Sequence, residues 1–514
     1  MNLYHLSTTA ALGGAACLLI FLLAGRLRKI VHDRGAGSIS LRQVIFLLAV
    51  WAGVIGWNHQ AYPLQHRLYY DEDVYANMAL NVLQGYGATV TAMRVGEVKE
   101  VHGYKWPPGF PTLMAPFVAA FGAEKGPARF NQLCGALTAL LLAALGYRLT
   151  ASVVGAYGAL LIYGLHPLAG GWYHAGSSEP LAVLLTALAL WAALECRFRS
   201  RDAGQDGSDW FLLSVLAGLL AMLVRLENVL LVLPLVLLLR KARLRFAARH
   251  YLILFLAAVP LLLCLAGHVA TLKPYYLADV PESTFFPALV LNNLRANIEF
   301  LLIYVPGPFL GLMVIAAFCG IILARRQGVK LNLTPWIVVL LIPLLHFGIL
   351  LFYSVGQYHA PGGSRFFLVQ LLGIAVIGAT LLAQWPFPRY RPWLMLAGML
   401  CYLVLLPDRT GVWQYFDSQN ESAVTEHVAI LEWAQSLPEG AVVLSRLPCL
   451  WENCGVYTAA PEYAGDPTVA GSAAIYEHYG LFNLSAGLPP PEGEAVESVP
   501  TPDGTVGLYR LRKR

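Results

Sequence analysis

Apolar runs of about 20 residues recur along most of the chain, and short basic segments separate many of them. A helix of that length crosses a bilayer, and basic residues concentrate in cytoplasmic loops. The first run, residues 6–24, is followed by Arg26, Arg28 and Lys29. A cleavable signal peptide carries its basic residues ahead of the apolar run, so we expect a retained helix here. The pattern predicts an all-α polytopic membrane protein with about twelve transmembrane helices.

The basic links also predict which side of the membrane each loop faces. If the link after the first run is cytoplasmic, residues 60–126 form a large external loop, since they are too polar and proline-rich to span. The basic segments 197–201 and 240–249 then lie inside. Residues 1–406 are the expected transmembrane domain.

The composition changes after Pro407 to a soluble, acidic tail. Residues 421–437 have the apolar spacing of a helix, and residues 441–445 and 505–509 have the pattern of strands. Residues 407–514 are therefore predicted to form a small C-terminal α/β domain, which the same topology places outside the membrane.

Charged residues interrupt one long apolar run. The run from Trp210 to Leu239 is too long for one simple helix, and Arg225 and Glu227 stand near its middle. We expect two short helices with the charged break on the outer side. Charges in apolar surroundings are costly and usually face a cavity, so this break is a candidate site.

Composition supports the membrane class. Hydrophobic residues make up 57% and charged residues 13% of the 514 positions, and that charged share is about half that of an ordinary soluble protein. The net charge of +5 does not indicate nucleic-acid binding, because the cations are concentrated in loops. We expect membrane lipid around the protein and no nucleic-acid partner.

A polar segment early in the external loop has helical periodicity. Asp73, Asn77, Asn81 and Gln84 recur on one face, and apolar residues occupy the other. We expect an amphipathic helix lying along the outer membrane surface. Glycines at 85 and 87 suit its carboxyl end, where a left-handed residue is often needed.

Three acids, Asp71, Glu72 and Asp73, stand at the start of this helix. Acidic residues commonly cap helix starts, so capping and catalysis are about equally good explanations for any one of them. Three acids at the lip of a membrane cavity exceed what capping requires. A carboxylate there can accept a proton from an incoming hydroxyl, and Asp71 is our first choice of base.

Cations on the same predicted side could hold a phosphate. Lys105 precedes a rigid proline turn, and Arg225 and Arg365 are placed on the outer side. Interfacial anchoring is the alternative for Lys105, and for a lone lysine it is the better one. Glu179 begins a helix from the outside, where it either caps that helix or lines the cavity.

Two further groups of residues leave alternatives open. His102, His174 and His359 could bind a divalent metal ion together with a carboxylate, but their spacing is not diagnostic, and we assign no cofactor. Cys449 and Cys454 close a short loop in the tail, and in an oxidising compartment they are predicted to form a disulfide. Two unpaired thiols are the alternative.

The motifs together resemble a known family. They are Asp71-Glu72-x-x-Tyr75-Ala76, Lys105-x-Pro107-Pro108, Glu179-Pro180, Arg225-x-Glu227 and Arg365-Phe366-Phe367. This combination is similar to the GT-C membrane glycosyltransferases, in the branch of protein O-mannosyltransferases and bacterial lipid A aminoarabinose transferases. The resemblance covers about residues 43–406, and many members carry soluble domains like the tail.

The resemblance implies sugar transfer from a polyprenyl-phosphate carrier to a lipid, glycan or protein acceptor. It implies a bacterial inner membrane with the site facing the periplasm. Asp71 stands in the catalytic acid position, and Glu72 would support the acceptor or the loop. Lys105 and Arg365 would hold the carrier phosphate, and Tyr75, Glu179 and Arg225 are further candidates for substrate binding.

Two other classes of function are compatible with parts of the pattern. A transporter or flippase of a lipid-linked sugar intermediate would use the same cavity charges as a pathway. A membrane anchor for the acidic tail explains the outer-face charges poorly. The enzyme is therefore the first hypothesis, and the transporter or flippase is the alternative.

Overall fold

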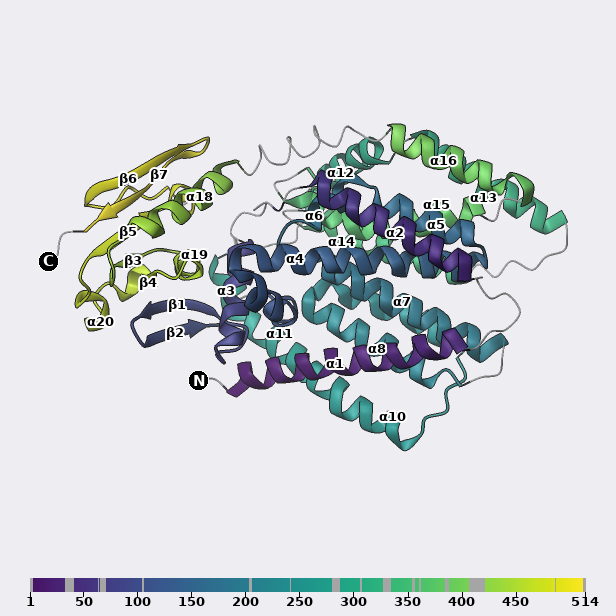
Figure 1. The fold of residues 1–514 in the computed structure, drawn as a ribbon, viewed down its shortest axis with the longest axis horizontal. Coiled ribbons are helices and arrows are strands. Elements are labelled where there is room, and N and C mark those ends of the chain that lie inside the picture. Colours follow the sequence, from purple (N-terminus) through teal and green to yellow (C-terminus); the bar gives the residue numbers. More distant parts are fainter. Residues whose placement is uncertain are drawn as a thin grey trace.

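The computed structural model is a bundle of helices joined at one end to a domain that contains a β-sheet (Figure 1). It describes residues 3–32, 41–62, 64, 71–103, 106–202, 206–240, 242–279, 287–305, 307–326, 334–353, 356–359, 362–383, 388–405, 421–485 and 487–511. The predicted combination of a helical polytopic membrane part with a C-terminal mixed-sheet region is confirmed. The predicted boundary between them, at residues 406 and 407, lies outside the described residues.

Helices form the membrane part. They are α1 (Leu3–His32), α2 (Leu41–Ala61), α3 (Asp71–Leu83), α4 (Gly109–Thr150), α5 (Val153–Gly164), α6 (Pro167–Trp172), α7 (Glu179–Asp202), α8 (Ser208–Val224), η1 (Leu226–Leu231), α9 (Val232–Leu239), α10 (Ala248–Ile253), η2 (Leu254–Ala258), α11 (Val259–Asp279), η3 (Pro287–Leu289), α12 (Val290–Tyr304), α13 (Gly307–Arg326), α14 (Thr334–Phe352), η4 (Gly363–Phe366), α15 (Phe367–Ala383), η5 (Pro388–Tyr390) and α16 (Arg391–Leu405). Among the described residues, five helical segments are long and apolar enough to cross a membrane, namely 42–61, 109–150, 179–200, 248–269 and 363–383, and shorter apolar helices accompany them.

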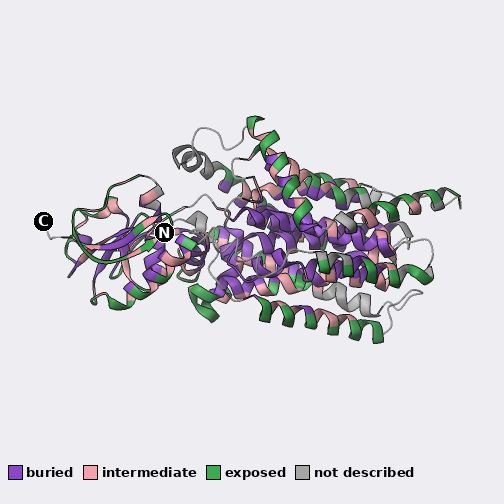
Figure 2. Ribbon diagram, turned by 90° about the horizontal axis from the view of Figure 1, so that it is seen from above, coloured by how far each residue is buried: buried purple, intermediate pink, exposed green. Residues whose placement is uncertain are grey.

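Helices α7 and α15 lie in the centre of the bundle, where nearly all of their residues are buried (Figure 2). Helix α7 packs against α4 and α8, and α15 packs against α5 and α14. Helix α2 is mostly exposed at the periphery, and its exposed side chains include Ile45, Phe46 and Leu48. An apolar exposed face of this kind suits contact with lipid tails.

Helix α4 begins earlier than the hydrophobic pattern predicts. The sequence between residues 60 and 126 is too polar and proline-rich to predict a spanning helix, but α4 starts at Gly109 and bends at Gly122, whose φ of 80° is left-handed. Its first part therefore lies within residues 60–126, the predicted external loop. Prolines at 111 and 116 and the polar residues near 124 obscured this helix in the sequence. Proline is tolerated in the first turn of a helix, and deeper prolines need packing partners.

The charged break between two short helices is confirmed. Helix α8 ends at Val224, Arg225 has extended φ and ψ angles, and a 3₁₀ turn from Leu226 leads into α9. The charged break therefore lies at the end of the bundle where α7 begins, and Arg225 contacts Glu179, the first residue of α7. Two short helices of 17 and 8 residues thus replace one long span.

The C-terminal domain has the helix and both strands predicted for it. Its elements are α18 (Glu421–Ser436), β3 (Val442–Leu444), α19 (Pro448–Asn453), β4 (Tyr457–Ala459), η6 (Pro461–Tyr463), α20 (Pro467–Ala470), β5 (Ile475–Tyr479), α21 (Leu481–Ser485), β6 (Glu494–Thr501) and β7 (Gly504–Arg510). Its core includes Trp433, Trp451 and Val506.

The sheet of this domain also contains a hairpin from the first loop. Strands β1 (Val90–Val95) and β2 (Val98–His102) complete the order β2-β1-β4-β3-β5-β7-β6. Strand β1 pairs antiparallel with β4, with Met93 opposite Ala459, whereas β3 runs parallel to β4 and β5. This sheet is therefore built from two parts of the chain, because β4 pairs with β3 on one side and with β1 of the first loop on the other.

The predicted disulfide in this domain is wrong. Cys449 and Cys454 are both free thiols, and Cys449 is buried. The residues between them form helix α19, and ideal helix geometry places residues i and i+5 roughly 8–9 Å apart at Cα. A disulfide needs Cα atoms within about 7 Å, so the helix itself prevents the bond.

Gly109 lies where α4 meets the end of α8, next to the charged break. A Cβ at this position would lie 2.6 Å from the backbone oxygen of Leu223. We expect Gly109→Ala to destabilise the protein by about 1–3 kcal/mol, the usual cost of overpacking. Thermal unfolding in detergent measures this, and Gly53→Ala, where a Cβ meets nothing within 4 Å, is the control. An unchanged midpoint for Gly109→Ala would contradict the close packing.

Candidate active site

Helix α3 lies between the bundle and the C-terminal domain rather than along the membrane surface, so the surface placement predicted for it is wrong. Asn77 and Asn81 are both 0% exposed. Val74 and Met78 join the core of the bundle, and the polar face packs against β1 and α19. The predicted amphipathic pattern of α3 is confirmed, but the C-terminal domain covers its polar face. Asn77, for example, contacts Glu452, which lies 375 residues further along the chain. Gly85 and Gly87 end the helix with φ angles of 83° and 76°, as expected.

A chain of ion pairs begins at Asp71, the first residue of α3. Oδ2 of Asp71 lies 2.6 Å from Nη1 of Arg365. Nε of Arg365 lies 2.9 Å from Oε1 of Glu179, at the start of α7. Arg225 contacts the same oxygen of Glu179 and also Glu227. Residues from four separate segments of the sequence therefore meet in one charged cluster.

A hydroxyl group and an aromatic ring make further contacts with the two arginines of the cluster. The hydroxyl of Tyr75 donates to Oγ of Ser178 at 3.2 Å, and Nη1 of Arg225 donates to the same oxygen at 3.2 Å. The ring of Phe366 lies 5.1 Å from the guanidinium carbon of Arg225 and 5.3 Å from that of Arg365. Such cation–π contacts hold guanidinium groups in place without neutralising them. Both arginines are therefore fixed beside carboxylates, and an anion must compete with those carboxylates for them.

The segment before α7 is held against α3 and α4. Glu72 accepts a hydrogen bond from the backbone N–H of Gly176. Asn131 of α4 donates to the carbonyls of Ala175 at 2.6 Å and Ser177 at 2.8 Å. These bonds place Glu179 beside Arg365. Glu72 is buried, and its hydrogen bond joins the start of α3 to the segment before α7.

Asp73 faces away from the charged cluster. Its Oδ1 lies 3.5 Å from Nδ1 of His427, on α18 of the C-terminal domain. Asp73 and Glu72 line a cavity of about 250 Å³ whose other walls include Glu124, Lys125 and His427. Asp71 and Asp73 thus have different partners, although only one residue separates them.

The remaining predicted residues are scattered. Lys105 lies outside the described residues. His102 contacts Tyr463 at 3.1 Å, His174 contacts the carbonyl of Gly170 at 2.7 Å, and the ring of His359 packs on an aromatic side chain of α12. Within the described ranges, no three histidine, cysteine or acidic side chains are arranged to hold a metal ion. The three histidines do not form the common site that their residue type suggested.

The environment of Asp71 suits proton acceptance. Its side chain is 21% exposed, and removal from water raises its pKa above the ordinary 3.8, although Arg365 acts in the opposite direction. A carboxylate with a raised pKa is a better base than an ordinary aspartate. Asp71 can therefore hold a guanidinium in one state and accept a proton in another.

Sequence reasoning missed several residues of the site. Ser178 links Tyr75 to Arg225, and its position directly before Glu179 was the available signal, because serine often caps a helix start. Phe366 entered only as part of a motif. His427, Glu452 and Asn453 reach α3 from the C-terminal domain, and no local pattern could have indicated them.

Comparison with protein families gives one match. Residues 105–269 match the family model described as dolichyl-phosphate-mannose-protein mannosyltransferase. The segment includes Glu179, Arg225 and Glu227. The resemblance inferred from the motifs is confirmed, and the chain is a membrane glycosyltransferase that uses a polyprenyl-phosphate sugar donor. A search of curated proteins found no significant match.

Comparison with solved structures gives matches that include two proteins. ArnT from Cupriavidus metallidurans bound to undecaprenyl phosphate is 13% identical, with a TM-score of 0.43 over 91% of this chain and 98% of that chain. The oligosaccharyltransferase of Archaeoglobus fulgidus in its apo form is 12% identical, with a TM-score of 0.49 over 91% of this chain and 74% of that chain.

Proposed function

We propose that this membrane glycosyltransferase, whose residues 105–269 match the dolichyl-phosphate-mannose-protein mannosyltransferase family, transfers its sugar to a hydroxyl group on the outer face of the membrane. Asp71 is the base, and Arg365 and Arg225 bind the phosphate of the donor. The transfer is a single displacement that inverts the anomeric carbon. The acceptor is a lipid, a glycan or a protein.

The observation that carries this proposal is the ion pair between Asp71 and Arg365, whose Oδ2 and Nη1 atoms are 2.6 Å apart. A donor phosphate bound by Arg365 competes with Asp71 for the same guanidinium. Guanidinium groups bind phosphate oxygens through paired N–H donors, so the phosphate is a strong competitor. Once displaced, the carboxylate of Asp71 is free to accept a proton beside the bound donor. Donor binding thereby activates the base.

The reaction balances with these groups. The acceptor oxygen attacks the anomeric carbon of the sugar and transfers its proton to the carboxylate of Asp71. The bond from the anomeric carbon to the phosphate oxygen breaks, and its electron pair stays on the lipid phosphate. Arg365 and Arg225 stabilise the charge that develops on this leaving group, as preorganised donors do. The phosphate leaves from the face opposite to attack, which inverts the centre.

The distribution of charge supports an outer location for the site. Helix α7 runs from Glu179, in the charged cluster, to Asp202. Arg197 and Arg199 lie near its far end, about 27–30 Å from Glu179 at 1.5 Å per residue. Basic residues mark the cytoplasmic end of a bundle, so the cluster belongs to the opposite face. The cavity lined by Glu72 and Asp73 lies at that same end of the bundle.

The test is a cell-free assay with purified protein in lipid. It combines labelled polyprenyl-phosphate sugar with lipid, glycan and peptide acceptors, and product analysis reports the anomeric configuration. Covalent transfer with inversion supports the proposal. Movement of the labelled lipid across liposomes without transfer would contradict it, and retention of configuration would contradict the single displacement.

The rate of transfer should fall on the acidic side of neutrality. Only the deprotonated carboxylate of Asp71 accepts a proton, so kcat/KM decreases as the pH falls through its pKa. Because burial raises that pKa above 3.8, the acidic limb should lie above pH 3.8. Measuring kcat/KM from about pH 4 to pH 8 checks this. A profile that stays flat down to pH 4 would contradict the assignment of Asp71.

A further inference from the structure

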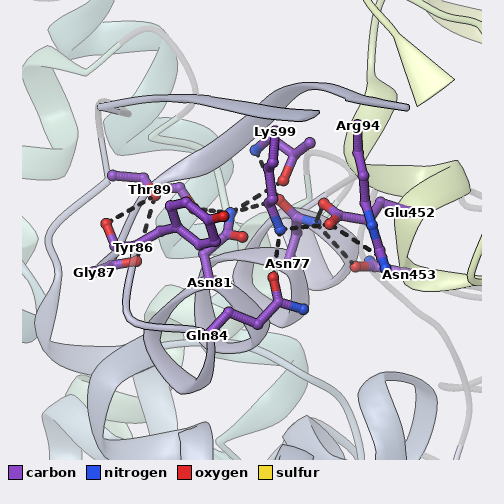
Figure 3. A network of polar contacts seen from close by, with 11 residues as sticks. Asn77, Asn81, Gln84, Tyr86, Gly87, Thr89, Arg94, Lys99, Glu452 and Asn453 are labelled. Atoms are coloured by element: carbon purple, nitrogen blue, oxygen red, sulfur yellow. Dashed lines mark hydrogen bonds and ion pairs between the residues drawn. The ribbon is translucent and has the colours of Figure 1, made fainter. Parts of the chain in front are cut away.

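Buried polar groups join helix α3 to the hairpin and to the C-terminal domain (Figure 3). Nδ2 of Asn77 donates to Oε2 of Glu452 at 2.8 Å, and Oδ1 of Asn77 accepts from the backbone N–H of Thr91 at 2.9 Å. One turn later, Asn81 donates to the carbonyl of Thr89 at 2.8 Å and to the hydroxyl of Thr91 at 3.1 Å. The polar face of α3 is therefore fixed by hydrogen bonds rather than by apolar packing.

Glu452, on α19, is the centre of this network. Its side chain is 1% exposed, its Oε1 is paired with Nζ of Lys99, and the same oxygen lies 3.5 Å from Nη1 of Arg94. Lys99 also donates to Oε1 of Gln84, just beyond the end of α3, at 2.6 Å. Both oxygens of Glu452 are thus engaged by the first loop. Replacing a buried and fully paired carboxylate leaves its donors without partners, which is costly.

The electrostatics of Glu452 agree with this arrangement. Burial alone would raise its pKa, but the hydrogen bonds from Lys99, Thr91 and Asn77 hold the pKa below the ordinary 4.5. The carboxylate is therefore charged at neutral pH. A charged acceptor makes stronger hydrogen bonds than a neutral one.

The next residue of α19 reaches the first turn of α3. Nδ2 of Asn453 donates to the backbone carbonyl of Asp73 at 2.8 Å. Asn77 and Asp71 are six residues apart on the same helix, or about 9 Å along its axis. A helix transmits a shift along its axis with little loss, so contacts at Asn77 and at the carbonyl of Asp73 set the position of Asp71.

We infer that Glu452 is a positioning residue for sugar transfer, which holds α3 through Asn77 so that Asp71 stands beside Arg365 and the donor phosphate. The inference rests on the proposed role of Asp71 as base. The C-terminal domain is then part of the architecture of the active site rather than a separable appendage. A displacement of about 1 Å at a reacting group can lower a rate by roughly 10²-fold.

The test compares variants of the full-length protein in the transfer assay. Glu452→Ala should lower kcat about 10- to 100-fold, while the Kd for polyprenyl phosphate stays within about 2-fold of wild type, because the arginines that bind it are untouched. A looser α3 admits water to Asp71 and lowers its pKa, so the acidic limb of kcat/KM should move to lower pH. Loss of folded protein alone would move neither the pH profile nor kcat per active molecule.

A double variant that exchanges the carboxylate and the amide between positions 452 and 77 keeps the inference testable if Glu452→Ala folds poorly. In Glu452→Gln, the amide nitrogen faces either Asn77 or Lys99, both of which are donors. In Asn77→Asp/Glu452→Gln, the new amide donates to the new carboxylate, and its oxygen still accepts from Lys99. The double variant should recover most of the kcat that Glu452→Gln loses.

The matched control is Glu426→Gln. Glu426 is a 2% exposed carboxylate in the same domain, and it accepts from the backbone N–H of Leu481 within that domain. Its replacement weakens a hydrogen bond inside the domain, so kcat should stay near the wild-type value. Wild-type kcat in both Glu452 variants, failure of the swap to recover activity, or an equal loss in Glu426→Gln would overturn the inference. Absence of transfer by the wild-type protein would instead overturn the proposed function.

Discussion

Replacing Asp71 by asparagine is expected to lower sugar transfer by about 10²–10⁴-fold, the range that a positioned general base contributes. Asparagine has nearly the same shape and can still accept a hydrogen bond from Arg365, so the protein should fold and bind the donor. It cannot take up the proton of the acceptor hydroxyl. The measurement is kcat with saturating donor, together with the Kd for polyprenyl phosphate by direct binding.

Asp73→Asn is the matched control for this prediction. Asp73 stands two residues further on the same turn, but its carboxylate faces His427 at 3.5 Å instead of Arg365. Transfer by this variant should remain within a few-fold of wild type. Equal losses in the two variants would indicate a shared base, and a fully active Asp71→Asn would remove Asp71 from the mechanism.

Replacing Arg365 by glutamine is expected to lower kcat/KM by about 10²–10³-fold, the usual effect of removing one donor to a developing negative charge. Arg365 contacts Asp71 at 2.6 Å and Glu179 at 2.9 Å, so its loss weakens phosphate binding and leaves Arg225, which pairs with Glu179 and Glu227, as the remaining arginine of the cluster. Both the KM for the donor and kcat should change. Steady-state kinetics with varied donor concentration separates the two effects.

Arg365→Lys should recover only part of this loss, because lysine supplies the charge without the planar pair of donors that guanidinium offers. The control is Arg295→Gln, which removes an 82% exposed arginine paired with Glu299 on the surface of α12. Exposed pairs of this kind contribute about 0–1 kcal/mol, so activity and stability should be unchanged. Wild-type kcat/KM in Arg365→Gln would exclude this residue from donor binding.

The charged cluster was largely predictable from local signals. Arg225 and Glu227 interrupt an apolar run, Glu179 begins a helix, and Asp71 begins another. A charge inside an apolar run must find a partner, so the sequence alone marks these positions as candidates. Their pairing was not predictable, since Glu179 could accept either arginine and the tertiary structure places both beside it.

The role of the polar face of α3 could not be predicted in the same way. Periodicity identifies a polar face, but it does not distinguish a face that contacts water from one that contacts a polar protein surface. The structure places β1 and α19 against this face, which converts a predicted membrane-surface helix into a buried link between two domains. The predicted disulfide failed for a local reason instead, because the segment that joins Cys449 to Cys454 is helical.

The amino-acid sequence by itself determined the membrane class, the charged break at Arg225, the helix that starts at Asp71 and the α/β character of the tail. These features depend on local properties, namely hydrophobic length, charge within apolar runs and residue periodicity. The tertiary structure alone decided that the hairpin of the first loop completes the C-terminal sheet and that Glu452 reaches Asn77. Strand pairing and buried hydrogen bonds join residues that are hundreds of positions apart, and their energies depend on that distant geometry rather than on neighbouring residues.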